Sequence, residues 1–349
     1  MGTGTLHIDL DAVAANWRAL SALAGAGCET AAVVKADAYG LGAGPVARRL
    51  AREGVRTFFV AVAEEGAAVR AAVGPGPAIF VMAGHMEGDA PALAGSALNP
   101  VLNSPGQVER HLAALPGHGF AVHLDTGLNR LGIEPQDWRA LKDRLRAARP
   151  ALVMSHLACA DEPGHPANGA QAALFRDLTA DMPVRRSLSA TGGILLGRGF
   201  CFDLVRPGVG LYGGAPFTAA RPVLRLSLPV IQTRWVEPGE IVGYGCGWTA
   251  GARSRIATVA AGYADGLHRR LAGRLRLWTG RTPCPAVGRL SMDLITVDVT
   301  GLDVVPDRLE VLGPEQGIDD LARAAGTIGY ELLTQLGRRY GRTYAGAVP

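Results

Sequence analysis

The sequence contains little cysteine, almost no lysine and no long apolar run. Its five cysteines are scattered and include no C-x-x-C pair, which argues against a disulfide framework or a zinc knuckle and favours a reducing compartment. No stretch of about 18 apolar residues is present to span a membrane. The N-terminal segment contains Asp9 and Asp11 but no basic region typical of a secretory signal. We therefore expect a cytoplasmic protein without a membrane partner.

The charge balance excludes another class of partner. The 349 residues include 35 basic and 31 acidic side chains, which gives a formal net charge of +4. No dense basic run is present, so we expect no nucleic-acid partner. The composition, 48% hydrophobic and 19% charged, is that of a globular protein. The length predicts two domains, or one large barrel with an appendage.

Lysine is the scarcest basic residue, because only Lys35 and Lys142 accompany 33 arginines. Lys142 lies in a charged segment typical of a solvated helix face. Lys35 instead ends the apolar run that begins at Ala31. A guanidinium does not deprotonate in proteins, whereas an amine does and then acts as a nucleophile or a base. Lys35 is therefore a candidate catalytic residue, with a lysine that merely reaches solvent from a strand end as the structural alternative.

The first 215 residues alternate between short apolar runs and helical periods. This alternation predicts an α/β fold, an N-terminal (β/α)8 TIM-type barrel, because it supplies eight strands. A doubly wound open sheet is less favoured, since no G-x-G-x-x-G segment opens the first unit. We expect strands at residues 31–35, 58–63, 78–82, 100–102, 120–125, 152–156, 184–188 and 204–211, and helices at 11–23, 45–53, 64–73, 88–94, 104–114, 136–149 and 167–180.

A β-rich pattern replaces this alternation near residue 220. Residues 223–230 nearly alternate between apolar and polar side chains, and turn residues separate the runs that follow. We therefore predict domains at residues 1–220 and 221–349, the second mostly β. Its strands are expected at 241–244, 256–260, 275–278, 295–299 and 309–312, followed by a helical pair at 319–336. A first strand at 5–8 is compatible with either domain.

Polar residues follow several of the predicted barrel strands, where barrel enzymes build their active sites. Arg130 lies in a glycine-flanked loop and could grip a carboxylate, or simply pair with Asp125. His156 ends the next strand, where a structural histidine is the alternative. Arg206 precedes Pro-Gly-Val-Gly, a segment that could offer backbone N–H groups to a phosphate or form an ordinary turn.

The second domain places two tyrosines among glycines. Tyr244 and Tyr263 could act as bases only beside a cationic or hydrogen-bonding neighbour, because a phenol titrates near about 10. The structural alternative for each is a tyrosine that covers a turn. The pair Met292 and Asp293 precedes a predicted strand. The sequence contains no H-E-x-x-H segment, serine nucleophile elbow, P-loop or cluster typical of a metal site.

The order of these motifs resembles that of the alanine racemase family along nearly the whole chain. The matching segments are AVVKADAYGLGA, LDTGLNRLGI, SHLACADE, VRPGVGLYGG, VGYGCGWTA, AGYADG and VGRLSMD. The resemblance implies a pyridoxal 5'-phosphate-dependent isomerase that interconverts L- and D-alanine by a two-base mechanism and supplies D-alanine for peptidoglycan. It also implies a head-to-tail homodimer, in which the β-rich domain of one subunit supplies the catalytic tyrosine to its partner.

The resemblance also assigns residues to roles. Lys35 looks like the lysine that forms the internal aldimine with the cofactor, and Tyr244 like the second catalytic base. Residues similar to those that contact the cofactor are Tyr39, His156, Thr191, Arg206, Gly208, Val209 and Arg338. Residues similar to those that bind or admit the small amino-acid substrate are Arg130, Tyr263, Met292 and Asp293.

Three other functions compete with alanine racemisation. A broader racemase would accept serine or lysine. A barrel-type pyridoxal-phosphate decarboxylase, or a non-catalytic carrier of the cofactor, would use the same barrel. The decarboxylases place an acidic residue at the ring nitrogen of the cofactor, so Arg206 argues for a racemase.

The sequence departs from the family pattern at a few positions. His123 stands where many members carry a carbamylated lysine that braces the substrate arginine. Ala190 replaces a common asparagine, Leu41 a frequent histidine, and Arg338 aligns with a tyrosine. These departures bear on cofactor affinity and substrate breadth.

Overall fold

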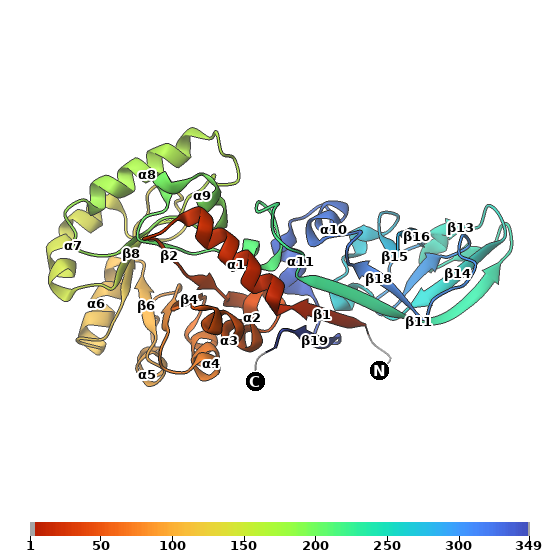
Figure 1. The fold of residues 1–349 in the computed structure, drawn as a ribbon, viewed down its shortest axis with the longest axis horizontal. Helices are drawn as coiled ribbons and strands as arrows, with labels where there is room; N and C mark the ends of the chain where they lie inside the picture. The colour runs from red at the N-terminus through yellow and green to blue at the C-terminus, as the bar shows by residue number, and fades with distance from the viewer. Residues whose placement is uncertain (1–3, 348–349) are drawn as a thin grey trace. The chain divides into compact units, whose positions relative to one another are not determined.

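The computed structural model describes residues 4–347, so residues 1–3 and 348–349 of the predicted domain ranges lie outside it. The described chain forms two compact units (Figure 1). The barrel unit comprises residues 13–212 and 216–221, and the C-terminal unit comprises residues 4–12, 213–215 and 222–347. Among residues 4–347, no helix is both long and apolar enough to cross a lipid bilayer.

Parallel strands close into a ring in the barrel unit. Seven of them form one sheet in the order β3 to β9, and β10 pairs with β2 in parallel. The N–H of Ala31 donates to the Val205 carbonyl at 2.9 Å, and that of Asp203 donates to the Arg186 carbonyl at 3.0 Å. β10 therefore bridges β9 to the segment that holds β2 and β3, and the predicted barrel is confirmed. The strands are β2 (Glu29–Thr30), β3 (Ala32–Val33), β4 (Thr57–Val60), β5 (Ala78–Val81), β6 (Asn99–Leu102), β7 (Ala121–His123), β8 (Leu152–Met154), β9 (Arg186–Ser187) and β10 (Leu204–Val205).

Helices alternate with these strands (Figure 1). Pro105, Pro135 and Pro166 each occupy the first position of a helix, where the missing N–H would have no helical partner. The Ser104 hydroxyl caps α6 by accepting the N–H of Gln107 at 3.2 Å. The helices are α1 (Leu10–Ala24), α3 (Ala43–Glu53), α4 (Ala63–Val73), α5 (Ala90–Gly95), α6 (Pro105–Ala114), α7 (Pro135–Ala148), α8 (Pro166–Thr179) and α9 (Thr191–Leu195).

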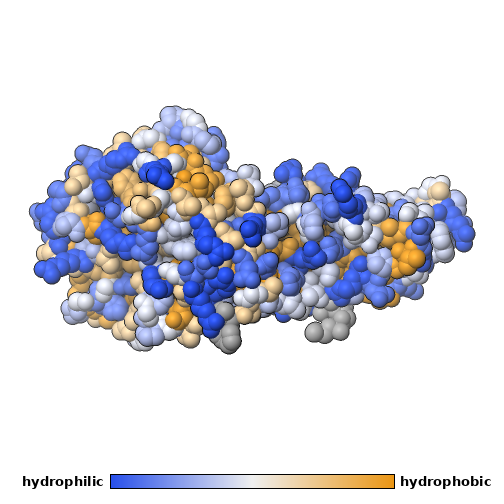
Figure 2. All heavy atoms as spheres, in the orientation of Figure 1, coloured by the Kyte–Doolittle hydropathy of each residue, from blue (hydrophilic) through white to orange (hydrophobic). Residues whose placement is uncertain are grey.

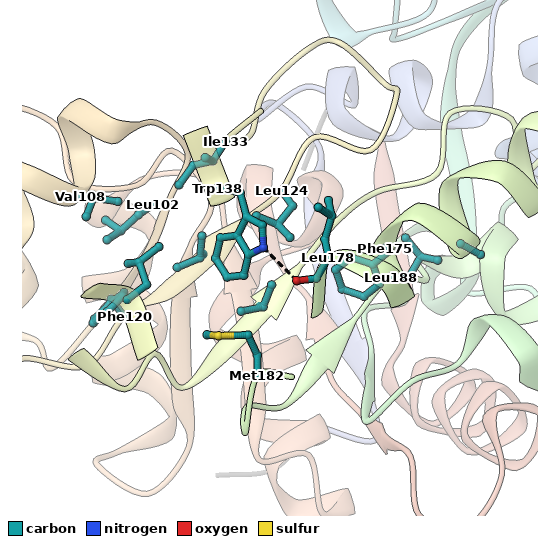
Figure 3. Close-up of a cluster of buried hydrophobic side chains, with 14 of the residues drawn as sticks. Leu102, Val108, Phe120, Leu124, Ile133, Trp138, Phe175, Leu178, Met182 and Leu188 are labelled. Carbon is teal, nitrogen blue, oxygen red and sulfur yellow. Dashed lines mark hydrogen bonds between the residues drawn. The ribbon is translucent and has the colours of Figure 1, made fainter. Parts of the chain in front are cut away.

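A buried apolar cluster fixes α7 and α8 against the strands (Figure 3). Trp138 of α7 is fully buried, and its indole N–H donates to the Leu178 carbonyl of α8 at 2.9 Å. Phe120, Phe175 and Met182 pack in the same cluster. The indole is thus buried without leaving its polar atom unpaired. The cluster therefore fixes the two helices, α7 and α8, that follow the loops after β7 and β8.

The C-terminal unit is built on a mostly antiparallel sheet in which β11 pairs with both β18 and β14, while β1 and β19 pair in parallel. The 13-residue strand β11 pairs with β18 through residues 226–229 and with β14 through residues 230–236. The first strand, β1, lies in this sheet between β11 and β19. The mostly β character predicted for this part of the chain is confirmed. The elements are β1 (Thr5–Asp9), β11 (Leu224–Val236), β12 (Ile241–Val242), β13 (Trp248–Thr249), β14 (Ser254–Val259), β15 (Arg276–Thr279), β16 (Thr282–Val287), β17 (Ile295–Asp298), β18 (Arg308–Leu312), α10 (Ile318–Ala325), α11 (Gly329–Gln335) and β19 (Gly341–Ala345).

Several predicted strands end earlier than expected, and four of these early ends bear on the site. β8 ends at Met154, so His156 follows the strand instead of ending it. β3 ends at Val33, so Lys35 starts the turn α2 (Lys35–Gly40) instead of ending a strand. β10 ends at Val205 because Pro207 has no N–H for a ladder, and the 3₁₀ helix η2 (Val209–Tyr212) follows. β12 ends at Val242, and Tyr244 lies in the 3₁₀ helix η3 (Tyr244–Cys246) after Gly243, which has a φ of 81°.

Three strands of the C-terminal unit had no counterpart among the sequence predictions. β16 contains Pro283 and Pro285, residues that argue against a strand, yet it pairs with β15 and β17. β13 has only two residues, and β19 follows a glycine and two arginines instead of an apolar run.

Candidate functional site

Lys35 lies two residues after the end of β3, at the carboxyl end of the barrel strands. The next four residues, Ala36 to Tyr39, all have left-handed backbone angles with φ between 52° and 55°. Burial lowers the pKa of the Lys35 amine, and the charge of Arg130 lowers it further, while Glu65 opposes both. The amine is therefore more easily deprotonated than that of an exposed lysine.

Tyr39 and Gly208 touch across the barrel end. Tyr39 is buried, and its ring lies 4.8 Å from that of Tyr212. A Cβ on Gly208 would lie 2.3 Å from the Tyr39 hydroxyl, so only glycine allows this contact. Two predicted phosphate contacts, from segments 169 positions apart in the chain, are thus brought together.

Thr191 organises the same region. Its Oγ1 accepts the N–H of Gly208 at 3.2 Å and of Gly210 at 3.3 Å, so the hydroxyl hydrogen is directed elsewhere. Val209 lies between these glycines and is 1% exposed. Among the described residues, no acceptor is bonded to the N–H of Val209. A buried N–H without a partner costs free energy unless an anion or water meets it.

Arg206 is almost completely buried. It donates from Nη1 to the Ser187 hydroxyl and from Nη2 to the carbonyls of Ser155, at 2.7 Å, and Leu188, at 3.3 Å. Its guanidinium carbon lies 5.9 Å from the centroid of the Phe59 ring. Among residues 4–347 it forms no ion pair and Nε donates to no acceptor, so Nε is left to meet a ligand. Burial lowers the pKa of Arg206 to about 9, which still leaves it charged at neutral pH.

His123 and Asn103 form a pair at the ends of β7 and β6. His123 Nδ1 lies 2.9 Å from Asn103 Oδ1. Asn103 Nδ2 donates to the carbonyls of Met82, at 2.9 Å, and Val101, at 2.7 Å, so Oδ1 must accept from the imidazole. The imidazole therefore carries its proton on Nδ1, and Nε2 is an acceptor.

Arg130 is exposed and does not pair with Asp125. The Asp125 carboxylate instead accepts the N–H groups of Gly127 at 2.8 Å, Leu128 at 3.0 Å and Asn129 at 3.2 Å. Among the described residues, Arg130 takes part in no ion pair. The ion pair between Arg130 and Asp125, which was the structural alternative for Arg130, is therefore not formed.

His156 completes a group of basic side chains that act on one another. Burial lowers the pKa of His156 to about 3, and the charges of Arg206, Arg130, His123 and Lys35 add to the decrease. Burial likewise lowers the pKa of His123 to about 4, with contributions from Arg206 and Arg130 that Asp125 opposes. Both imidazoles are neutral at physiological pH. The carboxyl end of the barrel is thus an electropositive site in which acids are few.

A second group of predicted site residues lies in the C-terminal unit. The N–H of Tyr263 donates to the Ser291 carbonyl, and that of Ala264 donates to the Met292 carbonyl, both at 3.1 Å. A Cβ on Gly262 would lie 2.3 Å from these two carbonyl oxygens, so glycine is required for the contact. Tyr263 and Met292 are held together by backbone bonds and leave their side chains exposed.

Arg339 joins this group, and the sequence did not identify it. Its guanidinium pairs with Asp265 at 2.6 Å and with Asp293 at 2.7 Å. Asp265 is buried and accepts the N–H of Gly262 at 2.9 Å. The neighbouring Arg338 is exposed in the turn after α11. One arginine thus ties the segment of Tyr263 to that of Asp293.

The Tyr244 side chain is 72% exposed, more than that of Met292 or Tyr263. Gly243 and Gly247 lie against the backbone of Arg289, and a Cβ on Gly245 would lie 2.8 Å from the Arg289 guanidinium. Residues 288–293 therefore contact both the turn of Tyr244 and the turn of Tyr263. The predicted site residues fall into one group in the barrel unit and one in the C-terminal unit.

Comparison with known proteins identifies the family. Residues 8–216 match the model of the alanine racemase N-terminal domain, and residues 223–344 match that of the C-terminal domain. The chain belongs to the alanine racemase family. The resemblance seen in the sequence is confirmed, as are the isomerase class and the cofactor that it implied.

Relatives in this family match the chain from end to end. An alanine racemase from Dinoroseobacter shibae is 61% identical over 348 residues, which cover 100% of both chains. The crystal structure of alanine racemase from Bartonella henselae, with covalently bound pyridoxal phosphate, has a TM-score of 0.93 and 35% identity, covering 99% of this chain and 100% of that one. That of biosynthetic alanine racemase from Pseudomonas aeruginosa has a TM-score of 0.90 and 36% identity, with coverage of 99% and 100%.

The barrel residues fit the family's cofactor. Pyridoxal phosphate presents an aldehyde, a ring nitrogen and an anionic phosphate. The buried N–H of Val209 and the hydroxyl of Thr191 suit the phosphate, and the Nε donor of Arg206 suits the nitrogen. The amine of Lys35, with its lowered pKa, suits the aldehyde.

The two buried imidazoles make stability depend on pH in the protein without cofactor. Their pKa values, about 4 for His123 and about 3 for His156, lie below that of an unfolded histidine, so the unfolded state binds more protons below about pH 6.5. Keeping these histidines neutral therefore costs no free energy of unfolding above that pH, and the free energy of unfolding decreases as the pH falls towards 4. Replacing His123 by Gln should reduce the loss of unfolding free energy between pH 6.5 and 5.5 by about 1 kcal/mol, measured by urea titration followed by circular dichroism. His7→Gln, at an exposed position of β1, is the control. Equal pH slopes in wild type and His123→Gln would contradict this account.

Proposed function

We propose that this protein interconverts L- and D-alanine in the cytoplasm with pyridoxal phosphate as cofactor and supplies D-alanine for peptidoglycan. The observation that carries the proposal is the group of basic side chains around Lys35 in a chain that matches alanine racemases throughout. Bound pyridoxal phosphate withdraws electrons from an amino acid and so acidifies the proton on its α-carbon.

Residues of the barrel would hold the cofactor. Lys35 would bind its aldehyde carbon covalently. The N–H of Val209, the hydroxyl of Thr191 and the side chain of Tyr39 would hold the phosphate, with Gly208 allowing their close approach. His156 would lie beside the ring as a neutral imidazole. The family resemblance also assigns a phosphate contact to Arg338, which is exposed in the C-terminal unit.

Arg206 would select racemisation. A guanidinium donates a hydrogen bond and remains protonated, so it would leave the ring nitrogen without a proton. That limits how far negative charge spreads into the ring and so disfavours side reactions such as transamination. Its neutral partners, the hydroxyl of Ser187 and the carbonyls of Ser155 and Leu188, hold it in place. A decarboxylase would need an acid at this position.

Two bases would exchange the proton on opposite faces of the substrate. The amine of Lys35, once free, takes the α-proton on one face, while the phenol of Tyr244 gives a proton to the other face. In the reverse direction Tyr244 accepts the proton and Lys35 donates it. Arg130, which no acid of the described chain neutralises, would bind the substrate carboxylate. Tyr263, Met292 and Asp293 would line a small opening that favours alanine over serine or lysine.

The exposure of the C-terminal site residues supports a homodimer. Tyr244 is 72% exposed, Met292 51% and Tyr263 41%. A proton transfer that depends on a positioned base requires a site from which bulk water is excluded. We therefore propose that a second copy of the chain covers these side chains in a head-to-tail dimer with two composite active sites.

Purified protein with added pyridoxal phosphate should abolish the optical activity of L-alanine, and do so faster than that of L-serine or L-lysine. Lys35→Ala should lose the cofactor's covalent attachment and at least about a thousandfold in rate, because it removes both the attachment point and one base. Lys142→Ala removes the only other lysine and should keep full activity. Release of carbon dioxide with no loss of optical activity would refute the racemase and favour a decarboxylase.

His123→Ala should raise the KM for alanine about tenfold and leave cofactor affinity unchanged. In this proposal the Nε2 atom of His123, whose ring is oriented by Asn103, accepts a hydrogen bond from Arg130. The loss of one charge-assisted hydrogen bond lowers binding by about tenfold. Initial rates and a fluorescence titration of cofactor separate the two quantities, with His7→Ala as the control. Equal KM values in wild type and His123→Ala would remove His123 from this role.

A heterodimer of two inactive chains tests the composite site. One chain carries Lys35→Ala and the other Tyr244→Phe, and each homodimer should be inactive. If each site combines Lys35 of one subunit with Tyr244 of the other, a heterodimer purified through two different tags contains one intact site. It should show about half of the wild-type activity. An inactive heterodimer that has bound cofactor would contradict the composite arrangement.

A further inference from the structure

A turn of left-handed helix follows Lys35. Ala36, Asp37, Ala38 and Tyr39 have φ values of 52° to 55°, and none of them is glycine. This conformation is unfavourable for each such residue, because it brings the Cβ too close to the following carbonyl oxygen. Four in succession persist only where bonds to the surrounding structure hold them.

The far end of the turn is held by its own residues and by the barrel. The carboxylate of Asp37 accepts the N–H of Ala43, and its carbonyl accepts that of Gly42, at 2.7 and 2.8 Å. The Tyr39 ring packs on Tyr212, whose hydroxyl donates to the Val33 carbonyl at 2.9 Å. These contacts fix the chain after Lys35 but not the peptide next to it.

The near end is held by a backbone bond from the N–H of Ala38 to the Val34 carbonyl, at 2.8 Å, and by one carboxylate. The N–H of Ala36 donates to Glu65 Oε1 at 2.7 Å, and the N–H of Ala61 donates to Glu65 Oε2 at 2.8 Å. Glu65 lies in the first turn of α4, and Ala61 directly follows β4, the neighbour of β3. Both oxygens of Glu65 are thus used, and they tie the peptide next to Lys35 to the end of the adjacent strand.

The charges around Lys35 differ in sign. Arg130, from the loop after β7, is the positive charge that acts on it. Glu65, from α4, is the acid that acts on it. Burial and Arg130 favour the neutral amine, and Glu65 favours the charged one.

We propose that Glu65 is a positioning residue for Lys35: its carboxylate anchors the left-handed turn at Ala36 and balances the charge of Arg130 at the amine. The role of the amine as cofactor attachment point rests on the proposed function, whereas the anchoring does not. Glu65 acts through the backbone of Ala36 and through space, not by contact with reacting atoms.

Glu65→Gln separates this role from a merely structural one. The amide has nearly the same shape, but it offers one acceptor oxygen instead of two and carries no charge. Glu64→Gln is the matched control, because Glu64 is the preceding residue of α4 and is exposed. A second variant, Glu65→Ala, removes both acceptors.

The first measurement is competitive acetylation of the full chain, freed of cofactor, over a range of pH and analysed by mass spectrometry. Only two lysines are present, so Lys142 serves as an internal reference. In Glu65→Gln the midpoint for acetylation of Lys35 should move to lower pH, while that of Lys142 stays. The Glu64→Gln chain should match wild type at both lysines.

The second measurement is amide hydrogen exchange in the loaded holoenzyme. Glu65→Ala should speed exchange in the peptide that spans residues 36–42 at least tenfold, with α7 and α8 unchanged as evidence of folding. An unmoved Lys35 midpoint in folded Glu65→Gln, or unchanged exchange in Glu65→Ala, overturns the proposal. Neither measurement requires turnover. Absence of racemisation would therefore refute the proposed function without affecting the positioning role.

Discussion

A buried guanidinium held by neutral oxygens is the constraint on which the candidate site depends. Arg206 is 2% exposed, and its guanidinium donates hydrogen bonds to a hydroxyl and two carbonyls. A carboxylate partner would neutralise it, whereas these oxygens leave its charge intact. Burial lowers the pKa values of His123 and His156, and the charge of Arg206 lowers them further. The barrel thus keeps two imidazoles neutral beside an arginine, and the site is left electropositive for an anionic ligand.

The parallel strand order turns residues from distant segments into one site. His123 ends one strand, His156 and Arg206 follow two others, and Lys35 follows a fourth. Carboxyl ends of parallel barrel strands meet at one end of the fold, so side chains that are far apart in sequence act on one another electrostatically. The Trp138 cluster shown in Figure 3 fixes α7 and α8, which lie on either side of the His156 segment in the chain.

The sequence allowed the barrel, the mostly β unit and the family to be predicted, because apolar periodicity and motif order are local signals. It did not reveal the left-handed turn, since Ala-Asp-Ala-Tyr contains no glycine that would announce a positive φ. That turn depends on Glu65, 29 positions later in the chain. The tautomer of His123 likewise depends on Asn103, and the two meet only when β6 pairs with β7. β16 was missed because its prolines argue locally against a strand, whereas its pairing with β15 and β17 forms the strand nonetheless.

The chemistry of a racemase explains why the predicted bases lie in different units. A single base returns a proton to the face from which it took it, so inversion requires a second base on the other face. Lys35 is fixed by the barrel, where burial lowers its pKa. Tyr244 stands on a short 3₁₀ turn whose glycines pack on Arg289, and its own unit leaves it mostly exposed. Within the C-terminal unit, Arg339 fixes the Tyr263 and Asp293 segments to each other, so residues 288–293 join the Tyr244 turn to the rest of the group. The C-terminal unit therefore presents a preformed but exposed group of side chains, and the proposal that a second copy of the chain completes the site rests on this exposure.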